Sequence, residues 1–168
     1  MSFENLSDWL DYFENRSPES HMKLGLERMQ HAIKALALCF KDKTVITVAG
    51  TNGKGSTVAT LQSLLTHHGE RVGAFFSPHL VKLNERFQIN QQMVSDQQLI
   101  SAFKATHSVA EKYGLSYFEW LALIAFWLFD QAEVRYLVME VGLGGRLDAV
   151  NAVDADIAII TNIDFDHT

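Results

Sequence analysis

The stretch TVITVAGTNGKGST, residues 44–57, decides the fold that we predict for this chain. Its first six residues are all β-branched or apolar, a pattern typical of a strand buried on both faces. Three glycines follow within the next six residues, and the segment from Ser56 onward (STVATLQSLLTHHG) predicts a helix that stops at Gly69. A strand that leads through a glycine-rich turn into a helix is the first unit of a parallel sheet.

Further strands are indicated at three places along the chain. Continuous apolar or β-branched runs lie at residues 71–77, 135–141 and 155–163, which favours strands buried on both faces. The short alternating segments ERFQIN and QQMV predict a hairpin excursion between the second and third of the four strands.

Two more helices are indicated between these strands. Ser95 and Gln98 form a capping box for a helix that ends near Gly114. Residues 117–131, YFEWLALIAFWLFDQ, are apolar nearly all round, so we expect a helix packed deep in the structure. The alternation predicts one α/β domain with a mostly parallel, doubly wound sheet of P-loop type, in three αβα layers.

Composition limits the classes of function. The chain carries a net charge of -6 and no cluster of Lys and Arg, which argues against a protein that coats nucleic acid. The longest apolar run, residues 120–129, is too short to span a bilayer, so we expect no membrane partner. Residues 1–17 carry acids where an export signal would carry basic side chains. With a single cysteine, Cys39, the chain is expected in a reducing cytoplasm.

A phosphate-binding loop is the functional interpretation of the glycine-rich turn. Successive backbone N–H groups in such a turn point at one anion, and the helix N-terminus adds partial positive charge. Lys54 would reach the β- and γ-phosphates, and Ser56 or Thr57 could approach a magnesium ion or a phosphate oxygen. The consensus G-x-x-x-x-G-K-[ST] is met only as a variant, because Val48 stands at its first glycine and Gly55 follows the lysine. The alternative is a turn that only reverses the chain.

Polar side chains also follow the other predicted strands. Ser77 follows the second strand, Glu140 ends YLVME, and His167 lies just beyond the last strand. In open parallel sheets ligands bind beyond the carboxyl ends of the strands, and Mg²⁺ takes few protein ligands besides phosphate oxygens and water. The pattern therefore predicts a magnesium site beside the phosphate loop. Taken alone, Glu140 could equally be a structural acid, and His167 more readily so.

A second glycine-rich stretch, EVGLGGRLDAVN, begins at Glu140. Gly144 and Gly145 allow backbone conformations that other residues resist, which predicts a tight loop near the ligand. The alternative is a structural turn that carries Arg146 and Asp148 as a surface ion pair.

Six motifs together resemble those of the folylpolyglutamate synthases and bifunctional dihydrofolate synthases, within the ATP-dependent Mur ligase superfamily. They are LGLERM, VAGTNGKGST, FFSPHLVKLNERFQIN, YFEWLALIAFWLF, MEVGLGGRLDAVN and TNIDFDHT. They follow the family's order and spacing nearly from end to end. Sibling ligases of cell-wall synthesis share the P-loop and the strand-end acid, whereas SPHLVKLNERFQIN and EVGLGGRLDAVN are of the folate type. The resemblance implies the fold of the Mur ligase central domain.

The resemblance also implies roles for site residues. The ATP phosphates would be bound by Thr51, Asn52, Gly53, Lys54, Gly55 and Ser56, and magnesium by Ser77, Glu140 and His167. The pterin would contact Lys23, Leu24, Gly25, Ser116, Tyr117, Phe118, Glu119, Leu147, Asp148 and Ala149. Lys54, Glu140 and His167 would be catalytic.

Several of these residues have competing interpretations. Leu24 and Leu26 could be the core stripe of a helix, and Phe118 and Trp120 are more often core side chains than ligand platforms. His79 could serve turn geometry after Pro78.

The implied reaction is carboxylate activation. ATP phosphorylates the carboxyl group of dihydropteroate, or of a folate's terminal glutamate, and the amine of L-glutamate attacks the acyl phosphate to form an amide. Magnesium and Lys54 would stabilise charge on the transferring phosphoryl group. The expected partners are therefore small molecules: ATP, L-glutamate, and dihydropteroate or a folate.

Family members continue well beyond DFDHT, so the resemblance implies that residues 1–168 are the N-terminal portion of the ATP-binding domain. The rest of that domain and a C-terminal domain would be absent, and this segment would be inactive alone. A nucleotide-binding module without turnover is the second hypothesis. We expect a monomeric full-length enzyme, and self-association of this segment through an exposed sheet edge.

A kinase or a GTPase is a third hypothesis. A GTPase would need a guanine-reading N-K-x-D segment, and TNIDFD, the nearest match, lacks the lysine. A small-molecule kinase would be separated from a ligase by its products.

Overall fold

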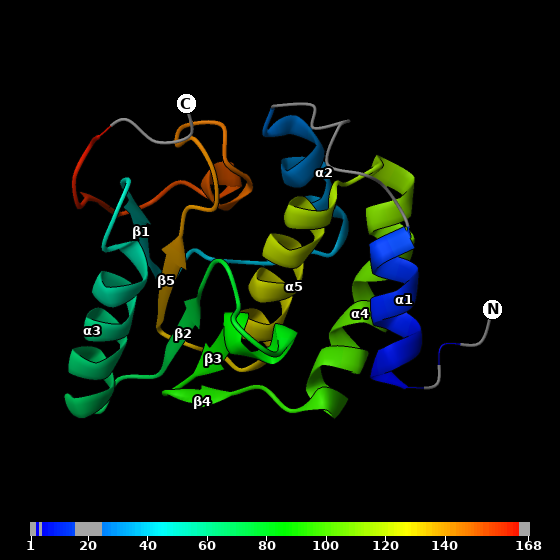
Figure 1. Ribbon diagram of the computed structural model, residues 1–168, viewed down its shortest axis with the longest axis horizontal. Helices are drawn as coiled ribbons and strands as arrows, with labels where there is room; N and C mark the ends of the chain where they lie inside the picture. Colours follow the sequence, from blue (N-terminus) through cyan, green and yellow to red (C-terminus); the bar gives the residue numbers. More distant parts are fainter. Residues whose placement is uncertain (1–2, 4, 16–24, 165–168) are drawn as a thin grey trace.

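A computed structural model describes residues 3, 5–15 and 25–164 of the chain. It contains one six-stranded sheet with helices on both faces (Figure 1). The strands are β1 (Thr44–Ala49), β2 (Val72–Phe75), β3 (Phe87–Ile89), β4 (Gln92–Met93), β5 (Tyr136–Glu140) and β6 (Ile157–Ile160). The α-helices are α1 (Leu6–Asn15), α2 (Glu27–Ala35), α3 (Lys54–His67), α4 (Asp96–Tyr113) and α5 (Tyr117–Gln131), and the 3₁₀ helices are η2 (Leu83–Arg86) and η3 (Ala149–Ala152).

The strand order β4-β3-β2-β5-β1-β6 gives a mostly parallel sheet. β1 pairs in parallel with β5 and β6, and β2 pairs in parallel with β5. β3 pairs antiparallel with both β2 and β4, which confirms the predicted hairpin excursion. The carboxyl ends of β1, β2, β5 and β6 therefore meet at one edge of the sheet, the upper edge in Figure 1.

Helices cover both faces of the sheet, as the alternation predicts. Ile46 and Val48 of β1 pack with Val58 of α3 in the smaller apolar cluster. On the other face α5 packs against the sheet and α4 packs against α5, while α1 contacts α4 and α2 contacts both α4 and α5 (Figure 1). The predicted doubly wound, three-layer α/β fold is confirmed.

The predicted helix boundaries follow from local chemistry. The Ser95 hydroxyl accepts a hydrogen bond from the Gln98 N–H at 3.2 Å, the Gln98 side chain accepts one from the Ser95 N–H, and α4 ends at Gly114 with φ of 60°. Residues of α5 from Trp120 to Phe126 are fully buried, as expected for its apolar sequence. None of the helices in the described part of the chain is long and apolar enough to cross a membrane.

The last strand differs from its prediction. The run at 155–163 was expected to be buried on both faces, yet Ile157 and Ile160 are 47% and 63% exposed. The reason is position: β6 pairs with β1 on one side, and no strand of the described ranges pairs with its outer edge. Apolar composition alone does not distinguish a covered strand from an edge strand. The expected exposed edge with apolar surface is therefore present.

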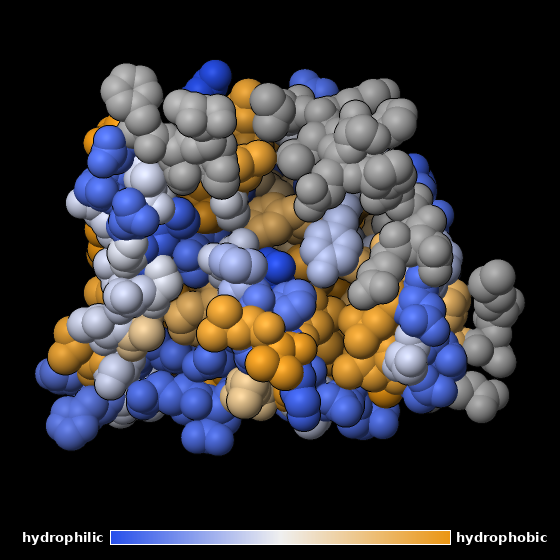
Figure 2. All heavy atoms as spheres, viewed as in Figure 1, coloured by the Kyte–Doolittle hydropathy of each residue, from blue (hydrophilic) through white to orange (hydrophobic). Residues whose placement is uncertain are grey.

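A second exposed apolar surface lies on the loop between β2 and η2. Leu80 and Val81 are 92% and 82% exposed, and Figure 2 shows an apolar patch over this loop in the middle of the face in view. The loop contains the cis peptide bond between Ser77 and Pro78.

Candidate functional site

A cleft of about 760 Å³ lies at the carboxyl edge of the sheet. It is lined by Gly50, Thr51 and Lys54 of the turn after β1, by Ser77 and Pro78 after β2, by the loop 141–146 after β5, and by residues of β6 and of the segment that follows it. The fold thus brings together the glycine-rich turn, Ser77 and the second glycine-rich stretch, which the sequence places far apart. Convergence of loops at this edge is what a ligand site in a parallel sheet requires.

The glycine-rich turn has the conformation of an anion-binding loop. Gly53 lies in the left-handed region, with φ of 81°, and is the N-cap of α3, so a residue with a side chain would be strained there. The helix begins directly at Lys54, and its first N–H groups have no intrahelical carbonyl to bind. The Thr57 hydroxyl donates to the Gly53 carbonyl at 2.9 Å, which favours Ser56 over Thr57 as the hydroxyl that faces a ligand.

The turn is braced by residues that follow β6. The N–H groups of Thr51 and Asn52 donate to the backbone oxygen and to Oδ1 of Asn162, at 3.0 and 2.8 Å. The Thr161 hydroxyl donates to the Asn52 carbonyl at 2.7 Å. These two N–H groups are therefore engaged, which leaves those of residues 53–56 as the donors for phosphate. Sequence reasoning missed this brace, although polar residues directly after a strand were a usable signal.

Lys54 lies over the loop that precedes it. Its Nζ donates to the carbonyl oxygens of Gly50 and Thr51 at 2.7 and 3.2 Å. The ammonium group is thus held against the turn, and Lys54 lines the cleft there.

Glu140 is buried beside the phosphate loop. Glu140 is only 4% exposed, and its Oε2 accepts a hydrogen bond from the Ser77 backbone N–H at 3.0 Å. A Cβ atom at Gly55 would lie 3.6 Å from the same oxygen, so the carboxylate adjoins the first turn of α3. Burial raises the pKa of Glu140, and the Ser77 N–H, Lys54 and Arg86 oppose that shift. Lys54 and Arg86 favour the ionised carboxylate, which is the form that can bind a metal cation.

The predicted metal ligands are thus partly assembled. Ser77 and Glu140 lie next to each other, whereas His167 falls outside the described residues. Residues 3, 5–15 and 25–164 contain no group of three His, Cys, Asp or Glu side chains that could hold a metal. One carboxylate and one hydroxyl beside a phosphate loop fit Mg²⁺, which keeps water and phosphate oxygens as its other ligands.

Arg86 contacts Ser77 and was not identified as a site residue from the sequence. It is 7% exposed, its Nε donates to His79 Nδ1 at 2.8 Å, and its Nη1 donates to Ser77 Oγ at 3.3 Å. Burial lowers the pKa of Arg86, while Tyr117 and Glu140 raise it. Burial lowers the pKa of His79, and the positive charge of Arg86 lowers it further. A neutral imidazole has a ring nitrogen that can accept the hydrogen bond from Arg86. The proposed turn role of His79 is therefore supported.

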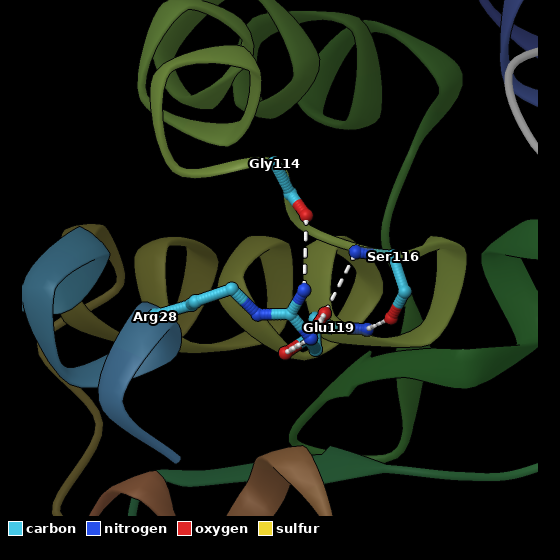
Figure 3. Close-up of polar contacts among 4 residues, drawn as sticks. All are labelled: Arg28, Gly114, Ser116 and Glu119. Carbon is cyan, nitrogen blue, oxygen red and sulfur yellow. Dashed lines mark hydrogen bonds and ion pairs between the residues drawn. The ribbon is translucent and has the colours of Figure 1, made fainter. Parts of the chain in front are cut away.

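Ser116 and Glu119, two of the residues predicted to contact the pterin, form a capping box at the start of α5. The Ser116 hydroxyl accepts the Glu119 N–H at 3.4 Å, and Glu119 Oε2 accepts the Ser116 N–H at 2.7 Å. Arg28 from α2 points at the same carboxylate, with Nη2 2.9 and 3.1 Å from its two oxygens, and its Nη1 donates to the Gly114 carbonyl (Figure 3). The Glu119 carboxylate is thus engaged by protein groups. Arg28 was not identified from the sequence, since its partner lies 91 positions away.

Of the aromatic residues at the start of α5, Phe118 packs against the second glycine-rich loop, while Tyr117 and Trp120 pack against other parts of the helical layer. The Phe118 ring lies so close to Gly142 that a Cβ atom there would collide with it, so the glycine-rich loop packs directly on this ring. Tyr117 packs edge-on against Phe13, with ring centroids 4.5 Å apart. Trp120 is fully buried and donates to the Thr106 hydroxyl, so it is a core residue.

Asp148 organises the loop after β5. Its Oδ2 accepts the N–H groups of Gly142 and Leu143 at 3.0 and 2.9 Å, and its Oδ1 accepts that of Val150 at 3.0 Å. Burial raises the pKa of Asp148, and these three N–H groups oppose the shift. The alternative of a surface ion pair with Arg146 is wrong, because Asp148 is 6% exposed and bound to the backbone. A structural turn is present.

The three segments predicted for the pterin come together in part. α2, α5 and η3 pack against one another, and Arg28 in the first turn of α2 binds Glu119 in the first turn of α5. Leu147 is 37% exposed there, whereas Ala149 is buried. Lys23 and Leu24 lie outside the described residues.

Comparison with known proteins gives a family match. The family described as Mur ligase middle domain matches residues 48–168. The dihydrofolate synthase/folylpolyglutamate synthase of Escherichia coli (strain K12) is 44% identical over 163 residues, which are 97% of this chain and 38% of the relative.

Solved structures of the same kind of enzyme are similar in fold. E. coli FolC in complex with DHPP and ADP has a TM-score of 0.91 at 44% identity, over 98% of this chain and 40% of that one. The bifunctional folylpolyglutamate synthase/dihydrofolate synthase of Yersinia pestis, complexed with AMPPNP and Mn ion, has a TM-score of 0.90 at 43% identity, over 98% and 40%. The chain therefore spans well under half the length of these relatives.

Proposed function

Because the chain belongs to the Mur ligase family through its middle domain, we propose that it forms the nucleotide-binding part of an ATP-dependent ligase. The ligase would join L-glutamate to dihydropteroate, forming dihydrofolate, and to folates, forming polyglutamates. The observation that carries the proposal is the place of Glu140, which adjoins the first turn of α3 and is bonded to Ser77. An acid at this position beside a phosphate loop is what a magnesium nucleotide requires.

Each group at the cleft has a proposed task. The N–H groups of residues 53–56 and the Lys54 ammonium would bind the phosphates of ATP, with Ser56 as a further hydroxyl contact. Ser77, Glu140 and His167 would hold Mg²⁺, which neutralises charge on the transferring phosphoryl group when it is bound. Thr51 and Asn52 would contribute through the shape of the loop, because their N–H groups are engaged by Asn162.

The pterin is proposed to bind where α2, α5 and η3 meet. Phe118 and the exposed part of Leu147 would supply apolar contacts, with Tyr117, Gly25 and Ala149 beside them. Ser116, Glu119 and Asp148 would act mainly by fixing the backbone, since their side chains are bound to protein groups.

We propose that turnover needs sequence outside these 168 residues. The chain spans 38% of the E. coli relative, so groups that contact adenine and glutamate would lie mostly outside these residues. The second hypothesis is a nucleotide-binding module without turnover, because part of a ligase would neither exclude water from the reacting groups nor position glutamate. The two differ in whether a longer chain forms an amide. The single exposed thiol of Cys39 suits a reducing compartment, which we propose is the cytoplasm.

The first test is calorimetry of ATP binding to this chain with and without Mg²⁺. We expect magnesium-dependent binding that is lost in Lys54→Ala and weakened in Glu140→Ala. Lys104→Ala, an exposed lysine on α4 far from the cleft, is the matched control and should bind as the wild type does. Absence of binding by a folded wild-type chain would contradict the assembled phosphate site.

A second test distinguishes a ligase from a kinase. A longer chain, incubated with ATP, dihydropteroate and glutamate, should yield an amide only when glutamate is present. A stable phosphorylated acceptor formed without glutamate would instead indicate a small-molecule kinase.

A further inference from the structure

Two adjacent side chains, Glu85 and Arg86, hold the loop between β2 and η2. The Glu85 carboxylate accepts the N–H groups of Leu80, Val81 and Lys82 at 2.7, 3.0 and 2.8 Å. Glu85 therefore fixes the exposed apolar end of the loop.

Arg86 fixes the other end, next to the phosphate loop. Its guanidinium donates to Ser77 Oγ and to His79 Nδ1, and it makes these bonds from a buried position. The loop 77–82 is thus held by two neighbouring residues with separate partners. Only Arg86 touches the residue that is proposed to bind the metal.

We propose that Arg86 is a positioning residue for the magnesium nucleotide, acting through the hydroxyl of Ser77. This inference rests on the proposed function of the cleft. A guanidinium can only donate hydrogen bonds, so it occupies one lone pair of Ser77 Oγ and turns the hydroxyl hydrogen away from itself. The remaining lone pair then has one defined direction, which a metal ligand needs.

Ser77 is held from both sides. Its backbone N–H donates to Glu140 Oε2 and its hydroxyl accepts from Arg86, so neither group can rotate freely. Because a buried guanidinium is costly without such partners, its position here calls for a role that uses it.

Glu85 supplies the control for a purely structural role. It is the sequence neighbour of Arg86 and makes three bonds to the same loop, but none to Ser77. If Arg86 only maintained the loop, loss of either side chain would have the same consequence for metal binding. A positioning role predicts an effect from Arg86 alone.

The test measures Mn²⁺ affinity by electron paramagnetic resonance at saturating AMPPNP. The full chain would be compared as wild type, Arg86→Gln, Arg86→Lys, Glu85→Gln, Ser77→Ala and the double variant Ser77→Ala/Arg86→Gln. We expect Arg86→Gln to weaken Mn²⁺ binding by roughly 10- to 100-fold, the usual effect of removing a group that orients a metal ligand. Glu85→Gln should bind Mn²⁺ as the wild type does, and the double variant should match Ser77→Ala.

The conservative variant keeps the test decisive if Arg86→Gln does not fold. Arg86→Lys retains the charge but not the planar guanidinium that reaches both Ser77 and His79. Its Mn²⁺ affinity should therefore lie between those of the wild type and Arg86→Gln. If Arg86→Gln does not fold, Arg86→Lys should still bind Mn²⁺ more weakly than the wild type does. Unchanged Mn²⁺ affinity in the folded Arg86 variants, with Ser77→Ala weakened, would overturn the inference and leave the proposed function standing. Equal weakening in Glu85→Gln would overturn it too. If the wild type showed no metal-dependent binding of AMPPNP, the proposed function itself would fail.

Discussion

Glu140 accepts a hydrogen bond from the backbone N–H of Ser77 at 3.0 Å, across 63 positions of sequence. The bond joins the carboxyl end of β5 to the residue two positions beyond β2, its neighbour in the sheet. The acid is therefore fixed relative to both strands before any ligand arrives, at the cost of burying a charge.

Removal of that charge should have opposite effects on stability and on binding. In Glu140→Gln the amide oxygen can still accept the Ser77 N–H, while the buried negative charge is gone. We expect a higher free energy of unfolding in urea for the ligand-free chain, and weaker magnesium-dependent ATP binding by calorimetry. Lower stability together with unchanged binding would contradict both the burial argument and the metal role.

The contact between Arg28 and Glu119 should stabilise the start of α5. Arg28→Ala removes the donor from a carboxylate that is largely buried, so we expect a loss of about 1–3 kcal/mol in the free energy of unfolding. A double-mutant cycle with Glu119→Gln, measured by urea denaturation, isolates the pair. Strict additivity of the two single changes would show that the pair is uncoupled, contrary to the geometry in Figure 3.

Stability should depend on pH through Asp148. Burial raises the folded-state pKa of Asp148 above its ordinary value of 3.8, so the folded chain binds this proton more tightly than the unfolded chain. The resulting stabilisation is complete below the unfolded pKa and is lost as the pH rises through the folded pKa. On acidification from about pH 7 to about pH 4, the unfolding free energy of the wild type should therefore rise relative to that of Asp148→Asn.

Asp154→Asn, a change of an exposed acid, is the control for that pH series. The unfolding free energy of the wild type should not rise in this way relative to that of Asp154→Asn. If it rose by the same amount relative to both variants, the burial of Asp148 would not be the cause.

Loss of the brace on the phosphate loop should weaken nucleotide binding while leaving the fold intact. Asn162→Ala frees the Asn52 N–H, so the loop must be ordered when ATP binds. From the net value of about 1 kcal/mol for a hydrogen bond, we expect roughly fivefold weaker ATP binding by calorimetry. Asn90→Ala removes a bond of the same kind, to the Val72 N–H at 2.8 Å, at the opposite end of β2, and should leave ATP affinity unchanged.

The exposed edge of β6 should cause self-association of this chain. Strand edges with apolar side chains pair with other chains, and Ile160 is 63% exposed here. We expect molar mass from light scattering to rise with concentration for the wild type, and Ile160→Lys to reduce that rise. Leu64→Lys, at a 54% exposed position on α3 away from the edge, should not. A wild-type chain that stays monomeric at all concentrations would refute this expectation.

The sequence was sufficient where structure depends on neighbouring residues. The path from β1 through the glycine turn into α3, the capping box at Ser95 and the hairpin of β3 with β4 all follow from periodicity or from contacts within a few positions. The convergence of Ser77 and Glu140 on the phosphate loop followed from a general property of parallel sheets.

Partners that meet only through the fold could not be predicted. Arg28 lies 91 positions from Glu119, and Asn162 lies 110 positions from Asn52. No local pattern marks such pairs, and the exposure of β6 depends on which strand lies beside it. For the same reason Asp148 was placed at the surface as an alternative, although its carboxylate is buried under backbone donors.

The brace by Asn162 also has a consequence for the order in which the site forms. During synthesis from the N-terminus, β1 and the turn after it leave the ribosome more than 100 residues before the groups that hold the turn in place. The phosphate loop is therefore completed by one of the longest-range contacts of the chain, and such contacts form slowly. A nascent chain would have β1, β2 and β5 in place before it could bind a nucleotide firmly, so capture of ATP would report that β6 had paired with β1.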